Sequence, residues 1–121
     1  MPKKAKVFLV DDNENIRNLI KESLKQEGHE VLIEARSLKE ALIKIKDASR
    51  KGVTIAIVDG SLVPPGDTFT NDGEKIASTL RKKIPNIRII SFSSHLANWG
   101  DKNLVKSKVA ISQLGEIVTD L

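Results

Sequence analysis

Two kinds of apolar pattern alternate along this chain. Short apolar runs occupy residues 7–10, 31–33, 55–58 and 87–92, and a weaker run occupies residues 103–105. Between and after them, apolar residues recur at helical spacing. These stripes are Ile16, Leu19, Ile20 and Leu24; Leu38, Ala41, Leu42 and Ile45; Ile76, Ala77, Leu80 and Ile84; and Ile111, Leu114, Ile117, Val118 and Leu121. The pattern predicts five strands and four helices.

Local signals mark where the predicted helices begin and end. Gly28 and Gly52 follow the first two stripes, and Pro85 follows the third, so each helix should stop there. The sequence SLKE at residues 37–40 is a capping box, in which the serine and the glutamate each accept a hydrogen bond from the other's free amide. The second helix should therefore start directly after Ser37.

Alternating strands and helices predict an α/β fold with a parallel sheet covered on both faces. Five strands suit an open, doubly wound sheet and are too few for an eight-stranded barrel. Two connections are irregular. Residues 60–71 form a long link after the third strand, whereas residues 94–101 leave too little chain for an average crossover helix of about 11–12 residues. We expect that fourth crossover to be reduced or absent, with Trp99 plugging the gap.

Composition narrows the functional classes. A chain of 121 residues predicts one domain spanning residues 1–121. The absence of cysteine excludes a disulfide scaffold, a thiolate zinc site and a cysteine nucleophile. No apolar run approaches the ~20 residues of a membrane span, and acids end the first run too early for a signal peptide. We therefore expect a cytoplasmic protein without a membrane partner.

The net charge of +4 raises the question of a nucleic-acid partner. Basic residues are interleaved with acidic ones along the predicted helices, and the chain has only three Phe, one Trp and no Tyr for base stacking. A solvated basic surface is the preferred interpretation. A homodimer through any exposed remainder of the last helical stripe stays an alternative.

The chemistry gathers where the predicted strands end. Asp11 and Asp12 follow the first run, Asp59 follows the third, Ser93 ends the fourth and Lys106 follows the fifth. Each residue alone is explained as a cap, a turn or a polar loop. Together they fall at the carboxyl edge of a parallel sheet, which is where such folds bind ligands.

This set of residue types has a definite chemistry. Close carboxylates repel one another unless a cation neutralises them, and oxygen-only ligands favour Mg²⁺. A lysine and a hydroxyl nearby suit the oxygens of a phosphoryl group. One carboxylate could itself act as the nucleophile and become an aspartyl phosphate.

At this point the chain resembles the receiver domain of two-component response regulators over nearly its whole length. The resemblance rests on KVFLVDDN at residues 6–13, on Asp59 after the third run, and on IISFS at residues 89–93. It implies a flavodoxin-like fold with strand order 2-1-3-4-5.

The resemblance also implies a metal-dependent phosphoacceptor. Asp59 would accept phosphate from the phosphohistidine of a sensor histidine kinase or a phosphotransfer protein. Asp11 and Asp12, with Asp59 and the backbone carbonyl of Ser61, would hold Mg²⁺. Such a chain would assist its own phosphorylation and would not be an enzyme.

The remaining roles follow from the same resemblance. Ser93 and Lys106 would contact oxygens of the phosphoryl group, and Ser93 would move toward it. Ser61 and His95, each two residues after a site residue, would tune the lifetime of the phosphate.

The chain departs from the family pattern at several positions. Ser107 follows Lys106, where receivers usually have a proline, and Lys102 and Lys108 are alternative choices for the site lysine. Asn103 stands where an aromatic switch residue is usual. With the fourth crossover helix reduced as well, the usual output face should be rebuilt. Two alternatives therefore remain open: a degenerate receiver that binds partners without phosphorylation, and a small Mg²⁺-dependent phosphatase.

Overall fold

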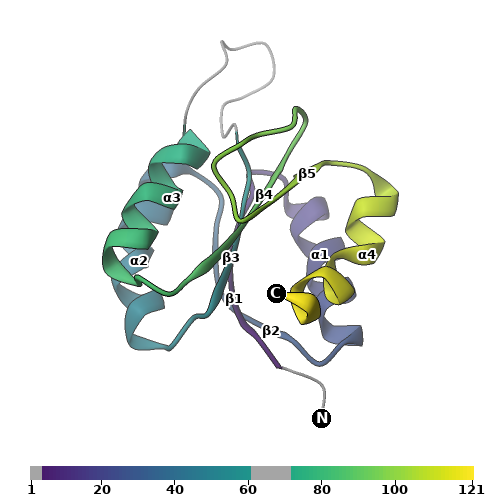
Figure 1. The fold of residues 1–121 in the computed structure, drawn as a ribbon, viewed down its shortest axis with the longest axis horizontal. Helices are drawn as coiled ribbons and strands as arrows, with labels where there is room; N and C mark the ends of the chain where they lie inside the picture. Colours follow the sequence, from purple (N-terminus) through teal and green to yellow (C-terminus); the bar gives the residue numbers. More distant parts are fainter. Residues whose placement is uncertain (1–3, 61–71) are drawn as a thin grey trace.

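The computed structural model describes residues 4–60 and 72–121. Within them, five parallel strands form one sheet in the order β2-β1-β3-β4-β5 (Figure 1). The strands are β1 (Lys6–Val10), β2 (Glu30–Ala35), β3 (Ile55–Val58), β4 (Arg88–Ser93) and β5 (Lys102–Val105), and the helices are α1 (Glu14–Gln26), α2 (Leu38–Arg50), α3 (Asp72–Lys83) and α4 (Lys108–Asp120). The predicted flavodoxin-like α/β fold is confirmed.

The central strands are apolar on both faces because both faces are covered. In β1, Phe8 and Val10 join the core under α2 and α3, whereas Val7 and Leu9 join the core under α1 and α4. The two helix pairs lie on opposite sides of the sheet in Figure 1. The edge strands β2 and β5 are less buried, so their apolar runs are shorter or more mixed.

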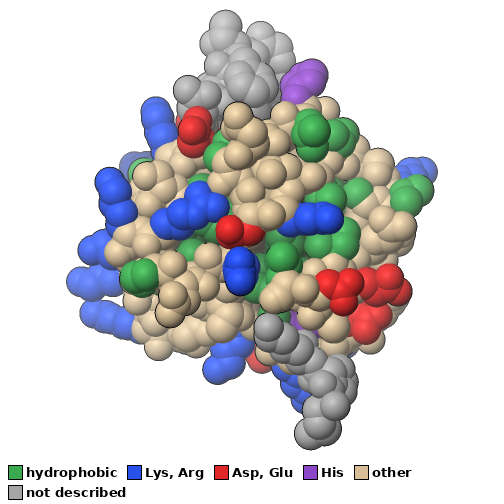
Figure 2. Space-filling model, viewed as in Figure 1, with side chains coloured by type: hydrophobic (Ala, Val, Ile, Leu, Met, Phe, Trp, Pro, Cys, Tyr) green, Lys and Arg blue, Asp and Glu red, His purple; other side chains and the backbone are tan. Residues whose placement is uncertain are grey.

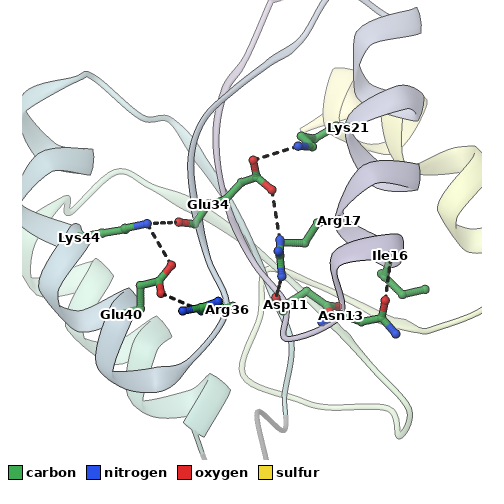
Figure 3. A network of polar contacts seen from close by, with 9 residues as sticks. All are labelled: Asp11, Asn13, Ile16, Arg17, Lys21, Glu34, Arg36, Glu40 and Lys44. Carbon is green, nitrogen blue, oxygen red and sulfur yellow. Dashed lines mark hydrogen bonds and ion pairs between the residues drawn. The ribbon is translucent and has the colours of Figure 1, made fainter.

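Side-chain caps begin three of the helices. Asn13, Ser37 and Ser107 each accept a hydrogen bond from the backbone N–H three residues later, at 3.1, 3.1 and 3.0 Å. Of the predicted capping box, the structure shows the hydrogen bond from the Glu40 N–H to the Ser37 hydroxyl. The Glu40 carboxylate pairs with Lys44 at 3.0 Å and with Arg36 at 3.4 Å (Figure 3), and the hydrogen bond from Lys44 is the main reason that the pKa of Glu40 is lowered.

The connection between β4 and β5 contains no helix, as the spacing predicted. We call residues 94–101 the β4–β5 segment. It folds back against the sheet: the Asp101 backbone N–H donates to the Ile89 carbonyl at 2.7 Å, and the Asp101 carboxylate accepts from the Ile89 N–H at 2.7 Å. Trp99, partly buried, packs against the core on the α2 and α3 side, consistent with the predicted plug.

Basic side chains that are scattered in the sequence gather in space. Figure 2 shows Lys and Arg side chains along the side of the molecule formed by α2 and α3. The last turns of these helices contain Arg50 and, in α3, Arg81, Lys82 and Lys83. Cations at helix C-termini are favoured by the helix dipole, so these four residues suit the ends of the two helices.

No helix in the described ranges is long and apolar enough to cross a membrane.

Candidate functional site

Three aspartates meet where β1 and β3 end side by side. Parallel pairing of Val10 with Val58 brings the following residues level, and the Asp59 N–H donates to the Val10 carbonyl at 2.9 Å. Carboxylate oxygens of Asp11, Asp12 and Asp59 lie within 4.8 Å of one another. Asp11 and Asp59 are only 1% and 4% exposed, whereas Asp12 is exposed. The acidic cluster is thus open to solvent at Asp12.

Lys106 joins this cluster from the end of β5. Its Nζ lies 2.8 Å from Oδ2 of Asp11 and 2.8 Å from Oδ2 of Asp59. Of the three lysines considered from the sequence, Lys106 is the one that reaches the acids, while Lys102 and Lys108 are exposed and the described contacts give neither an acidic partner. The backbone sets this choice, because the Lys106 N–H donates to the Ser93 carbonyl at 2.8 Å.

Burial and charge act on Lys106 in opposite directions. Desolvation is the largest single effect and lowers its pKa, since burial disfavours the charged ammonium. The hydrogen bonds and charges of Asp11 and Asp59 together outweigh desolvation, so the pKa of Lys106 is raised. The ammonium therefore stays charged at neutral pH and bridges the two carboxylates.

Ser93 lies beside the turn that follows Asp59. The Ser93 side chain is buried, and its Oγ donates a hydrogen bond to the carbonyl of His95 at 2.6 Å. A Cβ placed on Gly60, the residue after Asp59, would lie 2.9 Å from this Oγ. The hydroxyl is thus close to the Asp59 turn and is currently held by the β4–β5 segment. Ser61, to which a carbonyl ligand and a modulatory role were assigned, lies outside the described residues, and His95 is exposed.

The hydrogen bonds that hold Asp11 in place were not predicted from the sequence. Oδ1 of Asp11 accepts from the Asn13 N–H at 2.9 Å, and the Asp11 carbonyl accepts from Nη1 of Arg17 at 2.7 Å (Figure 3). Arg17 also pairs with Glu34 of β2 at 3.2 Å, and Lys21 pairs with Glu34 at 3.0 Å. The sequence signal for Arg17 is weak, because its partners come from two other elements.

The donor set fits Mg²⁺. Three carboxylates from two strand ends provide hard oxygen ligands in one place, and neither cysteine nor histidine belongs to the group. This is the ligand type that Mg²⁺ prefers, and an octahedral ion bound through few carboxylates retains positions for water or phosphate oxygens. Asp11, Asp12 and Asp59 are the residues that would hold it.

Comparisons with known proteins agree with this fold. No family model matches the chain. A putative NtrX-like response regulator from Rickettsia felis is 36% identical over 89 residues, which cover 74% of this chain and 17% of the relative. The receiver domain from Methanospirillum hungatei has a TM-score of 0.72 at 21% identity, covering 98% of this chain and 93% of its own.

A further solved structure is the CheX–CheY complex with BeF3 and Mg from Borrelia burgdorferi. Its matching chain has a TM-score of 0.76 at 20% identity, with 96% of this chain and 87% of that chain covered. The chain therefore has the fold of response regulator receiver domains, and over 89 residues it is similar in sequence to one response regulator. The chain spans only 17% of the length of the curated relative that it matches.

Proposed function

We propose that this receiver is a Mg²⁺-dependent phosphoacceptor in cytoplasmic two-component signalling, with Asp59 as the residue that becomes phosphorylated. The donor is the phosphohistidine of a sensor histidine kinase or a phosphotransfer protein. The observation that carries the proposal is the shared position of Lys106, 2.8 Å from both Asp11 and Asp59, inside a cluster of three carboxylates.

The surroundings of the acids suit different roles. Both oxygens of Asp11 have partners, the Asn13 N–H at 2.9 Å and Lys106 at 2.8 Å, so Asp11 is held as a fixed ligand. Asp12 is the exposed member, through which an ion can enter from solvent. Asp59 directly follows the central strand β3, the position that receivers use for the acceptor.

The transfer itself is a displacement at phosphorus. An Asp59 oxygen forms the new bond to phosphorus, and the bond from phosphorus to the histidine nitrogen breaks. The nitrogen leaves with the electron pair and takes up a proton. Bound Mg²⁺ supplies positive charge to the carboxylates and to the phosphoryl oxygens. Each chain accepts one phosphoryl group, so it is a substrate of the transfer and not a turnover enzyme.

Two side chains stabilise the added charge. The Lys106 ammonium is positioned to pair with a phosphoryl oxygen, and the Ser93 hydroxyl can donate its hydrogen to another. That hydrogen is now given to the His95 carbonyl, so phosphorylation would exchange one acceptor for the other. The Ser61 carbonyl completes the proposed metal ligands, and the side chains of Ser61 and His95 modulate how long the phosphate lasts.

The direct test is phosphorylation by a small donor. The chain is incubated with acetyl phosphate and MgCl2, and its intact mass is measured. Wild type should gain one phosphoryl group, and both EDTA and Asp59→Asn should prevent the gain. Asp47→Asn, which alters an exposed aspartate of α2, is the matched control and should behave as wild type. A modification that persists in Asp59→Asn would contradict the assignment of the acceptor.

A receiver that binds partners without phosphorylation is the second candidate. It is favoured by the direct pairing of Lys106 with Asp11 and Asp59, which offsets part of their negative charge without a metal, and by the missing crossover helix. An unmodified mass with acetyl phosphate, and also with a phosphorylated histidine phosphotransfer domain, would support it over phosphotransfer. Turnover of a phosphomonoester would instead support the phosphatase alternative.

A further inference from the structure

Trp99 of the β4–β5 segment lies against the backbone of the turn that follows Asp59. A Cβ placed on Gly60, next to Asp59, would lie 3.7 Å from Cζ2 of Trp99. A Cβ on Gly73, in the first turn of α3, would lie 2.7 Å from the same atom and 2.5 Å from the carbonyl oxygen of Asp59. The ring edge therefore reaches this turn because residue 73 is a glycine, and at Gly60 it comes within ordinary van der Waals contact of the position that a Cβ would take.

The two glycines are also joined to each other. The Gly73 N–H donates to the Gly60 carbonyl at 3.3 Å, so the start of α3 and the turn after β3 meet under the indole. The remainder of the Trp99 side chain packs on the core and borders an open hollow of about 430 Å³ that Ser78 and Arg81 also line. The indole thus extends from a solvent-facing surface to the peptide that follows Asp59.

The ring is held from its own side as well. The N–H of Gly100, the next residue, donates to Oδ1 of Asn103 at 2.9 Å, and the Gly100 carbonyl accepts from Nδ2 of Asn103 at 3.1 Å. Asp101 is fixed to Ile89 through two hydrogen bonds of 2.7 Å. This end of the segment is anchored to β4 and β5. The backbone next to Trp99 is therefore held in place where the ring contacts the turn after Asp59.

We propose that Trp99 is a positioning residue for the phosphoacceptor: through Gly60 and Gly73 it sets the backbone position of Asp59 and links the β4–β5 segment to the state of that site. The inference rests on the proposed function. Removing the ring opens a void beside the turn, and a carboxylate that must share a metal and Lys106 then loses its fixed position. Small displacements of reacting groups have large effects on rate.

Ring substitutions separate positioning from simple packing. Trp99→Leu retains an apolar side chain, and Trp99→Phe retains a smaller ring at the same place. Leu96→Ser is the matched control, because Leu96 belongs to the same segment and is 70% exposed. For each protein, MgCl2 affinity is measured by calorimetry, phosphorylation by acetyl phosphate is followed by intact mass at saturating MgCl2, and urea unfolding reports stability.

We expect Trp99→Leu to fold, to bind Mg²⁺ more weakly and to be phosphorylated about tenfold more slowly. Trp99→Phe should recover most of both losses, and Leu96→Ser should match wild type. Trp99 is the single tryptophan of the chain, so its emission in wild type should also change when MgCl2 and beryllofluoride are added together.

The inference would be overturned if Trp99→Leu were less stable than wild type but kept the wild-type Mg²⁺ affinity and phosphorylation rate. The ring would then only fill space. If wild type is not phosphorylated, the proposed function fails. The Mg²⁺ affinities of wild type and Trp99→Leu still decide the inference in that case: a weaker affinity in the variant supports it, and equal affinities overturn it.

Discussion

Lys106 shows how one side chain can stabilise two buried acids. Its ammonium lies 2.8 Å from both Asp11 and Asp59, and its side chain is only 22% exposed. Removing one partner of a buried ion pair leaves uncompensated charge, which costs about 3 kcal/mol or more. The same contacts raise the pKa of Lys106 against the opposing effect of desolvation, so its contribution to stability depends on pH.

The sign of that dependence follows from the raised pKa. A group whose pKa is higher in the folded state contributes fully below its unfolded pKa, about 10.4 for lysine, and loses the contribution as pH rises through the folded value. In EDTA at neutral pH, Lys106→Met should therefore be less stable than wild type by about 3 kcal/mol. The difference should shrink above about pH 10.4.

Urea unfolding from pH 7 to pH 11 measures both effects. Lys102→Met is the control, because Lys102 is exposed and its ammonium has no ion-pair partner among the described contacts. It should follow the wild-type profile. A stability difference for Lys106→Met that stays constant up to pH 11 would show that the lysine acts through packing and not through its charge.

Among the elements, the β4–β5 segment stands where a crossover helix is expected, and hydrogen bonds hold it against the sheet. Ser91 of β4 is fully buried, and its hydroxyl donates to Oδ1 of Asn103 at 2.7 Å. The same Oδ1 accepts from the Gly100 N–H at 2.9 Å. The polar side chains of Ser91 and Asn103 would pack poorly under the apolar face of a helix. They instead form hydrogen bonds with each other and with the backbone of the closely packed segment.

Asn103→Ala should lower the free energy of unfolding by about 1–3 kcal/mol, because it leaves the Ser91 hydroxyl and the Gly100 amide without their acceptor. Asn98→Ala, at an exposed position of the same segment, should change stability little. Urea unfolding of the two variants gives the comparison. Equal stabilities would mean that water replaces Asn103 without cost.

Helices α1 and α4 cross at Gly115. A Cβ on this residue would lie 2.5 Å from the carbonyl oxygen of Ser23 and 2.7 Å from Cγ of Glu27. The Ser23 hydroxyl also accepts from the Gly115 N–H at 3.1 Å. The two helices therefore approach closely only because residue 115 has no side chain.

Gly115→Ala should destabilise the protein by about 1–3 kcal/mol through overpacking, although alanine is the better helix former. Ser78→Ala at an exposed position of α3 shows what the propensity gain alone does and should be neutral or slightly stabilising. Thermal unfolding of both variants tests this. A rise in Tm for Gly115→Ala would show that α1 and α4 can separate at little cost.

For the whole molecule, a bound ion and folding are linked. An ion that binds the folded state alone stabilises it by about 1.4 kcal/mol at ten times its Kd. MgCl2 should therefore raise the Tm of wild type, and EDTA should reverse the rise. In Asp11→Asn the effect should be much smaller, because a buried member of the acidic cluster loses its charge.

Glu14→Gln is the control for that measurement, since it removes an acid from the first turn of α1 outside the cluster. It should keep the wild-type response to MgCl2. An equal rise of Tm in Asp11→Asn would place the ion elsewhere on the protein.

The amino-acid sequence by itself determined the elements and the edge at which the site lies. Apolar runs that need cover on both faces predict central parallel strands, and the acids that follow residues 10 and 58 must then share one edge. The spacing of residues 94–101 also predicted the missing helix. These are consequences of local pattern, so they could be derived without coordinates.

Only the tertiary structure decided which distant groups touch. It brought Lys106, the lysine preferred from the sequence, to within 2.8 Å of both Asp11 and Asp59, because β5 pairs with β4 in one register. It also placed Trp99 on two glycines and Arg17 on the Asp11 carbonyl. Such contacts join elements far apart along the chain, and their distances are set by the packing of the whole sheet and its helices, which local periodicity does not encode.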